Sequence, residues 1–350
     1  MPAEWEPHRA TWISWPHYEP DWPGKLGPIP WVYAEIVRVL ADHETVEILC
    51  HSPEVRDTAR LALEAHGVAL KRVRLHEVAT DRVWLRDSAP TGVIDVTGAV
   101  VLLNWAFNGW AKYSNWHLDA TVGAAVARLT GLRREEPRRR DNGERVVLEG
   151  GGIEVNGQGL LLATEEWLLS EAQVRNPDLG RDDYERIFRD WLGIHHTIWL
   201  GEGCVGDDTH GHIDDVARFV SADTVVVAVE EDPRDDNHAR SLDNVRRLES
   251  ASRNADVGPL RIVRLPFPRP VMMNGERLPA SYANFYIANG VVLVPTFNDP
   301  TDRIALNTLA DLMPAHRVVG IHAVDLVWGL GTLHCLTQQE PAPHEAVRVR

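Results

Sequence analysis

Cys335, close to the end of the chain, is the best candidate for a nucleophile. It lies in the segment 329–335 (GLGTLHC), where glycines leave space around what we expect to be a short strand. A thiol becomes an effective nucleophile when a neighbouring cation or base lowers its pKa. The alternative is an inert buried cysteine, which suits Cys50, because that residue lies inside an apolar strand.

A histidine and an aspartate lie close together in the segment 207–215 (DDTHGHIDD), immediately before an apolar strand. If this segment is extended, His212 and Asp214 are two positions apart and their side chains point the same way. An imidazole and a carboxylate would then share one cavity. The alternative is an acidic loop whose histidines are exposed to solvent.

Two further acids stand beside turn residues. Asp87 lies in 84–90 (WLRDSAP), next to a proline turn, and Glu149 precedes the three glycines at 150–152. Glycines allow other groups to approach closely, although Asp87 could instead pair with Arg86 or cap the turn. The glycine run is a weak phosphate signal, because it leads into a strand and offers no helix N-terminus.

These acids, the histidine and the cysteine together indicate chemistry on a guanidinium group. Two carboxylates can hold a planar guanidinium through paired charge-assisted hydrogen bonds. The central carbon of a protonated guanidinium is electrophilic, so a thiolate could add to it. This chemistry requires no metal ion and no other cofactor.

Two alternatives from other classes remain open. The run His210-x-His212-x-Asp214 resembles the His-x-His-x-Asp run of metallo-β-lactamase-type zinc hydrolases, and further ligands for zinc would have to come from His238, His316 or His322. That interpretation leaves Cys335 without a role. A non-catalytic propeller that uses its 13 tryptophans as a binding surface is the second alternative.

The elements that must position these residues repeat along the chain. Four segments have the pattern of a β-hairpin, and their equivalent residues Val93, Ile153, Arg218 and Phe285 are 60, 65 and 67 positions apart. Asn-Gly at 156–157 and at 289–290 is a strong hairpin signal, because both positions of the expected turn need a positive φ. The predicted hairpins span residues 91–103, 152–162, 217–229 and 285–294.

Each hairpin is followed by an amphipathic helix and a single strand. The helices are expected at 118–129, 183–192, 236–250 and 302–312, and the strands at 146–148, 197–200, 260–265 and 317–321. The N-terminal part adds helices at 33–41 and 54–65 and strands at 46–50 and 68–75.

Such a period predicts modules packed around an axis, each too small to bury its own apolar face. We therefore expect an α/β fold of about five pseudo-symmetric modules in one domain, residues 1–350. Two doubly wound α/β domains are the alternative, but neither a Gly-x-Gly-x-x-Gly run after a strand nor a P-loop is present.

Composition limits the partners and the compartment. The chain of 350 residues has 36 Lys and Arg against 51 Asp and Glu, and a formal charge of −15 disfavours nucleic acid and attracts cations. Three widely spaced cysteines encode no disulfide framework, which points to the cytoplasm. The N-terminus lacks the pattern of a signal peptide, and apolar runs such as 225–229 are too short to span a membrane.

The motifs resemble those of the agmatine deiminase and bacterial peptidylarginine deiminase family of guanidino-group-modifying enzymes. The resemblance spans the chain and rests on segments 1–8 (MPAEWEPH), 12–16 (WISWP), 84–87 (WLRD), 148–151 (LEGG), 211–214 (GHID), 282–286 (YANFY) and 334–339 (HCLTQQ). It implies a five-module α/β-propeller with ββαβ repeats around a central site, and no cofactor.

The resemblance also implies a role for each candidate. Cys335 would be the nucleophile, His212 the acid and base, and Glu149 a partner in proton handling. Asp87 and Asp214 would clamp the guanidinium, while Trp84 and Asn284 match positions that line the site. The chain departs from the family pattern at Ala89, His210, Trp328 and Leu330, which spares these chemical groups but affects the expected substrate.

The expected reaction is the hydrolysis of agmatine to N-carbamoylputrescine and ammonia through a covalent thiouronium on the cysteine. Arginine or peptidylarginine could replace agmatine, and an amidinotransferase would share the first half of the reaction. Segment 88–127 contains no arginine and only one lysine, Lys112, to meet a substrate carboxylate. This favours agmatine as the small cationic substrate. A homo-oligomer is possible.

Overall fold

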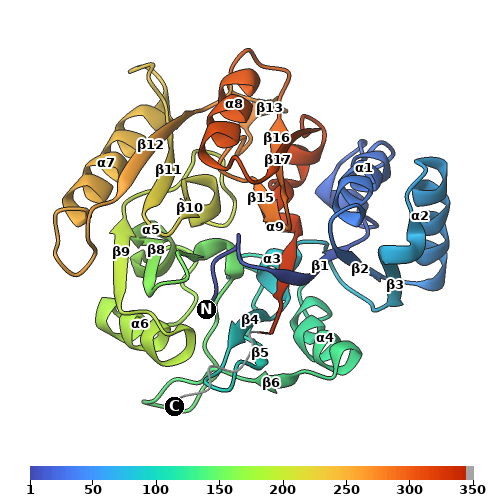
Figure 1. The fold of residues 1–350 in the computed structure, drawn as a ribbon, viewed down its shortest axis with the longest axis horizontal. Helices are drawn as coiled ribbons and strands as arrows, with labels where there is room; N and C mark the ends of the chain where they lie inside the picture. Colours follow the sequence, from blue (N-terminus) through green and yellow to red (C-terminus); the bar gives the residue numbers. More distant parts are fainter. Residues whose placement is uncertain (344–350) are drawn as a thin grey trace.

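The computed structural model of the protein describes residues 1–343 and has a mixed α/β fold built from several small sheets. Residues 344–350, which the predicted single domain includes, lie outside the described residues. Figure 1 shows the sheets arranged about the middle of the molecule, with helices such as α2, α7 and α8 toward the outside. No sheet of the described chain has more than four strands, so the alternative of two doubly wound domains is wrong.

Four sheets of three strands share one construction. In each, an antiparallel hairpin is followed along the chain by a helix and by a third strand that pairs in parallel with the second strand of the hairpin. The hairpins are β4 (Thr91–Ile94) with β5 (Val100–Leu103), β7 (Glu154–Val155) with β8 (Leu160–Thr164), β10 (Ala217–Ser221) with β11 (Thr224–Val229), and β15 (Tyr286–Ala288) with β16 (Val291–Thr296).

The helices and third strands complete these four sheets. The helices are α4 (Val122–Thr130), α6 (Arg181–Ile187), α7 (Asp236–Ala251) and α8 (Asp302–Leu312), and the third strands are β6 (Arg133–Glu135), β9 (His196–Leu200), β12 (Arg261–Pro266) and β17 (Arg317–His322). A short hairpin of β13 (Met272–Met273) and β14 (Glu276–Arg277) and a short helix, α5 (Glu165–Leu169), lie between these elements.

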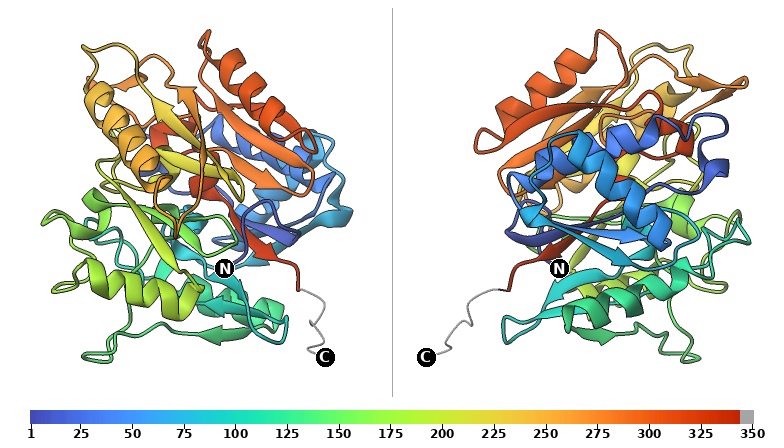
Figure 2. Two further views of the ribbon diagram at one scale, coloured as in Figure 1. Left: turned by 60° about the vertical axis from the view of Figure 1, so that its left-hand side comes forward. Right: turned by 90° about the vertical axis from the view of Figure 1, so that its right-hand side faces the viewer.

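The two ends of the chain build the remaining sheet together. The last strand, β18 (Gln338–Pro341), pairs antiparallel with the first, β1 (His8–Ser14), and β2 (Thr45–Cys50) and β3 (Val73–Glu77) extend the sheet in parallel. Figure 2 shows β18 lying beside β1 although more than 320 residues separate them. Helices α1 (Ile29–Ala41) and α2 (Pro53–Ala65) connect the parallel strands. This pairing brings Cys335, just before β18, next to the N-terminal segment.

Burial explains why these elements form. Strand β16 lies in the core, where Val291, Val292, Leu293 and Val294 are all fully buried. Helix α8 covers its sheet with Ala305 and Leu309, one helical turn apart. Within the described residues, no helix combines the length and the apolar character that a membrane span needs.

All four predicted hairpins are confirmed. Gly157 and Gly290 adopt a positive φ, but Asn156 and Asn289 do not, so the expectation of a positive φ at both turn positions is wrong. The predicted strand at 146–148 is wrong as the third strand of its sheet, because β6 takes that place. The residues of β6 are Arg-Arg-Glu and exposed, so they carry no apolar pattern. Val146 and Leu148 are apolar for another reason: they are buried in the core immediately before Glu149.

Candidate active site

Cys335 lies on a short helix, α9 (Leu333–Leu336), and not on the strand that the sequence predicted. Its thiol lines a pocket of about 250 Å³. A Cβ added at Gly331 would lie 3.2 Å from Cys335 Sγ and 2.8 Å from the ring of Trp84. Glycine at 331 therefore makes room for both side chains. Trp84 lines the same pocket, as the sequence predicted.

Two polar groups contact the thiol. The Nδ2 of Asn284 donates to Cys335 Sγ at 3.0 Å, and Sγ lies 3.5 Å from Oδ2 of Asp214. The Oδ1 of Asn284 accepts hydrogen bonds from the Thr332 hydroxyl at 2.8 Å and the His334 amide at 3.0 Å. Asn284 is fully buried and fixes the start of α9 from behind the thiol. Burial, together with the charges of Asp214 and Asp215, raises the pKa of Cys335 well above its ordinary value.

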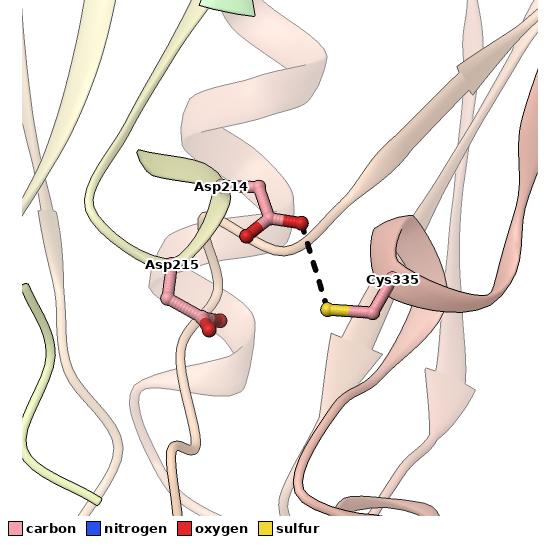
Figure 3. Close-up of side chains that lie close together, drawn as sticks. All are labelled: Asp214, Asp215 and Cys335. Atoms are coloured by element: carbon pink, nitrogen blue, oxygen red, sulfur yellow. Dashed lines mark hydrogen bonds between the residues drawn. The ribbon is translucent and has the colours of Figure 1, made fainter. Parts of the chain in front are cut away.

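Asp214 and Asp215 face Cys335 from the short 3₁₀ helix η6 (Ile213–Asp215), as Figure 3 shows. The segment is thus not extended, contrary to the sequence prediction. Oδ2 of Asp214 lies 2.7 Å from Nδ1 of His334, whereas its Oδ1 is buried and has no hydrogen-bond partner among the described residues. One oxygen of this carboxylate is therefore held and the other is available to a ligand.

His212 lies between two of the predicted acids. Its Nδ1 is 3.8 Å from Oδ2 of Asp87, and its Nε2 is 3.6 Å from Oε2 of Glu149. The Trp167 ring and the imidazole pack edge to face, with 5.6 Å between ring centroids. Burial lowers the pKa of His212, but Asp87 and Glu149 outweigh it and raise the pKa to about 9. The imidazolium form is therefore present at neutral pH.

The two acids beside His212 differ in their environment. Glu149 accepts hydrogen bonds from Trp167 Nε1 at 2.7 Å and Arg175 Nε at 3.1 Å. Burial raises the pKa of Glu149, but Arg175 and His212 lower it to about 2. Asp87 accepts from Trp110 Nε1 at 2.8 Å, yet burial raises its pKa to about 6, with a further contribution from Asp214.

The glycine run brings these groups together, as the sequence suggested. The Gly151 amide donates to Oδ1 of Asp87 at 2.9 Å. A Cβ at Gly151 would lie 2.6 Å from His212 Nδ1 and 3.2 Å from Asp214 Oδ2. Any side chain at this position would displace the histidine or the carboxylates, so glycine is required.

The lining of the pocket carries more negative than positive charge. Asp21, Asp87 and Asp208 line it together with Arg82, which is its one lining residue of positive charge within the described chain. Arg82 is engaged, because its Nη1 lies 2.5 Å from Oδ1 of Asp21 and its guanidinium stacks 4.0 Å over the ring of Tyr113. The pocket therefore suits a cation.

Comparison with known proteins shows to which family the chain belongs. A sequence model of the Porphyromonas-type peptidyl-arginine deiminase family matches residues 1–341. The chain belongs to this family. An agmatine deiminase from Ectopseudomonas mendocina is 35% identical over 369 residues, which cover 99% of this chain and 96% of that protein.

Two solved structures of the deiminase family are similar over nearly the whole chain. The agmatine deiminase of Enterococcus faecalis has a TM-score of 0.88 at 28% identity and covers 97% of this chain and 95% of that one. A Cys-to-Ser variant of the agmatine deiminase of C. jejuni with substrate bound has a TM-score of 0.85 at 26% identity, with 97% and 96% covered.

The positions of the histidines do not support the zinc alternative for this deiminase family member. The Nε2 of His210 lies 2.9 Å from the Ser170 hydroxyl, and its Nδ1 lies 3.9 Å from Glu166. His212 instead faces Asp87 and Glu149, so the two rings do not converge on one point. The one group of possible metal ligands found in the described part of the chain contains no histidine: Asp214, Asp215 and Cys335.

Sequence reasoning missed several groups of the site. His334 is adjacent to Cys335, which was a signal that could have been used. Trp110, Trp167 and Arg175 are far from the motifs that they contact, and no local pattern marks them. The other two cysteines, Cys50 and Cys204, are free and buried, and burial raises the pKa of both.

We expect His212 to titrate near pH 9 in the folded protein. The test is an NMR pH titration of the imidazole in the Cys335→Ser variant, with and without Asp87→Asn. Because the charge of Asp87 is the largest single contribution that raises the pKa of His212, its replacement should lower the midpoint by about one unit or more. A midpoint at or below the ordinary histidine value of 6.5 in the Cys335→Ser variant would contradict this account.

Proposed function

We propose that this chain is an agmatine deiminase, which hydrolyses agmatine to N-carbamoylputrescine and ammonia. The observation that carries this proposal is the buried carboxylate of Asp214, whose Oδ2 lies 3.5 Å from Cys335 Sγ and whose Oδ1 has no hydrogen-bond partner among the described residues, with Asp87 and an imidazolium, His212, in the same site. Two carboxylates and a thiol at this spacing suit a planar guanidinium whose carbon is attacked by sulfur. The activities of the relatives from E. mendocina and E. faecalis support the same choice.

In the first half-reaction, the guanidinium binds between Asp87 and Asp214. Its positive charge offsets the carboxylates that raise the pKa of Cys335 and favours loss of the thiol proton to solvent. The thiolate then forms a bond to the guanidinium carbon. His212 gives its proton to one nitrogen, the C–N bond breaks, and ammonia leaves. The product of this half-reaction is a cationic thiouronium on Cys335.

In the second half-reaction, water replaces the ammonia. Neutral His212 takes a proton from the water while the oxygen adds to the thiouronium carbon. The C–S bond then breaks, its electron pair returns to sulfur, and the oxygen loses its remaining proton to solvent to give the ureido product. Ionised Glu149 stabilises the imidazolium in both halves. An amidinotransferase would differ only in admitting an amine instead of water.

We expect agmatine to be preferred over free arginine by at least about a hundredfold in kcat/KM. The two differ by a carboxylate, and among the described residues that line the pocket the one positive group is Arg82, which Asp21 already engages. A buried carboxylate without a partner costs several kcal/mol. The test measures ammonia release from agmatine, arginine and arginyl peptides at two salt concentrations, because salt screens long-range repulsion but not a missing contact.

Comparable kcat/KM for arginine at both salt concentrations would contradict agmatine as the substrate and favour arginine or arginyl peptides. The same assays with a chelator test the zinc alternative, because the proposed route uses only protein side chains and water. Loss of activity on chelation would contradict that route. Turnover of none of the guanidino compounds would favour a binding protein.

We also propose that the five sheets of three or four strands form one domain, a five-module pseudo-symmetric propeller of ββαβ repeats around this site. The common order of strands in four sheets and the joining of both chain ends in the fifth support it. The three free cysteines, one of them the proposed nucleophile, fit a reducing cytoplasm. The homo-oligomer and the absence of nucleic-acid and membrane partners stay predictions.

A further inference from the structure

His334, the residue before the proposed nucleophile, bridges two buried carboxylates. Its Nδ1 lies 2.7 Å from Oδ2 of Asp214, and its Nε2 lies 2.8 Å from Oε2 of Glu4. The side chains of all three residues are at most 4% exposed. An imidazole can satisfy a carboxylate at each nitrogen only by donating from both. The His334 ring therefore donates to Glu4 at one nitrogen and to Asp214 at the other. Oδ2 of Asp214 in turn lies 3.5 Å from Cys335 Sγ.

Glu4 is held as strongly as a single carboxylate can be. Each of its oxygens accepts two hydrogen bonds, so the carboxylate that contacts Nε2 of His334 is fixed in place. The donors are Arg218 Nη2 at 2.9 Å, the Ile287 amide at 2.8 Å, Arg86 Nη2 at 3.2 Å and His334 Nε2 at 2.8 Å. Burial raises the pKa of Glu4, but Arg218 and His334 outweigh it and hold the pKa well below its ordinary value.

The same ring controls Asp214. Burial raises the pKa of Asp214, and the hydrogen bond and charge of His334 are the strongest groups that lower it. Because His334 holds Oδ2, the carboxylate cannot rotate freely, and its unpartnered Oδ1 stays in one direction. The reaction mechanism proposed above uses Asp214 but assigns no task to His334 or Glu4.

We propose that His334 is a positioning residue, anchored by Glu4, that aims the free oxygen of Asp214 at the substrate guanidinium. This inference rests on the proposed function. It makes residue 4, at the start of the chain, part of the support of a site whose nucleophile is residue 335. The pairing of β1 with β18 brings these two segments together.

Two substitutions at His334 test the contacts of its two ring nitrogens separately. His334→Asn keeps a donor near the position of Nδ1 and so keeps the contact with Asp214, whereas His334→Gln places its donor near Nε2 and keeps only the contact with Glu4. In the background of Cys335→Ser, which prevents turnover, calorimetry measures the binding of agmatine and of the product, which keeps the amine of agmatine but has an uncharged ureido group in place of the guanidinium. His334→Gln should weaken agmatine binding by about a hundredfold, His334→Asn by less than about tenfold, and product binding should change little in both.

The expected ranking is specific to positioning. A residue with only a structural role would affect agmatine and the ureido product alike, and the Asn and Gln variants equally. Equal agmatine affinities for the two variants, or a weaker affinity for the Asn variant, would overturn the proposal. Absence of agmatine turnover by the wild-type enzyme would instead overturn the proposed function, so the two failures are distinguishable.

A second variant and a control keep the test decisive. Glu4→Gln removes one of the two carboxylate charges that contact the His334 ring. It should weaken agmatine binding by about tenfold or more without changing product binding. Unchanged agmatine binding would overturn the proposal that Glu4 anchors His334. The matched control is His76→Asn, which breaks another His–carboxylate contact, from His76 Nε2 to Glu47 Oε2 at 2.6 Å, away from the pocket. It should leave agmatine binding unchanged. If His334→Gln does not fold, as judged by thermal unfolding, Glu4→Gln carries the test.

Discussion

Replacement of Cys335 by serine is expected to reduce ammonia release from agmatine by at least about four orders of magnitude, with the fold retained. A neutral hydroxyl is a far poorer nucleophile than a thiolate, and loss of a catalytic nucleophile typically costs a factor of this size or more. The smaller oxygen fits the space beside Asn284 and Gly331, so the thermal midpoint should change little. Steady-state ammonia release and thermal unfolding measure the two effects.

Two comparisons locate the covalent step. Cys50→Ser is the matched control, because that cysteine is fully buried in β2 and burial raises its pKa to about 12; it should retain normal turnover. Intact-mass analysis of the wild-type enzyme, quenched with acid during turnover of agmatine, should detect the thiouronium on Cys335, because both half-reactions pass through this covalent intermediate. Near wild-type turnover of Cys335→Ser, or an adduct mapped to Cys50 or Cys204, would rule out the assigned nucleophile.

Asp87→Asn and Asp214→Asn should each lower kcat/KM for agmatine by about 30-fold to 4,000-fold. Removal of one partner of a desolvated charge pair costs roughly 2 to 5 kcal/mol, and about 1.4 kcal/mol corresponds to a factor of ten. Trp110 Nε1 and the Gly151 amide donate to the two oxygens of Asp87. In Asp87→Asn an NH2 group would replace one of these oxygens and face a donor, which adds to the loss. Steady-state kinetics with agmatine measure the loss.

The matched control for the clamp is Asp243→Asn. This aspartate pairs with Arg247 on the surface of α7 and lies outside the pocket, so its replacement should leave kcat/KM unchanged. If a variant at 87 or 214 keeps more than about a tenth of the wild-type kcat/KM, that residue does not bear the charge of the guanidinium.

Local patterns predicted most elements of the fold, because each hairpin and helix is defined by nearby residues. Asn-Gly turns marked two of the hairpins, and a helical period of apolar residues marked α7 and α8. Strand β6 was missed because an exposed Arg-Arg-Glu segment has no such pattern; pairing with β5 alone makes it a strand. The extended conformation predicted for residues 212–214 was wrong for a similar reason. Packing of its buried residues sets η6, and an alternation of apolar and polar residues does not reveal it.

The sequence by itself was enough to name the chemical groups that we propose for the site. Types and order of residues were enough to select Cys335, His212, Glu149, Asp87 and Asp214, and the glycines beside them indicated close approach. Protonation is different, because a pKa depends on burial and on charges from distant segments. Asp87 and Glu149 are both buried acids, yet Arg175 keeps one ionised and burial raises the pKa of the other to about 6.

Only the tertiary structure decided how those groups are oriented. The contact of Glu4 with His334 spans 330 positions of the chain, and it exists because β1 and β18 pair. No local rule relates residues so far apart, since hydrogen bonds of this kind depend on the closure of the fold and not on spacing. Contacts between distant segments likewise leave Oδ1 of Asp214 without a partner, join its Oδ2 to His334 and pair Arg82 with Asp21.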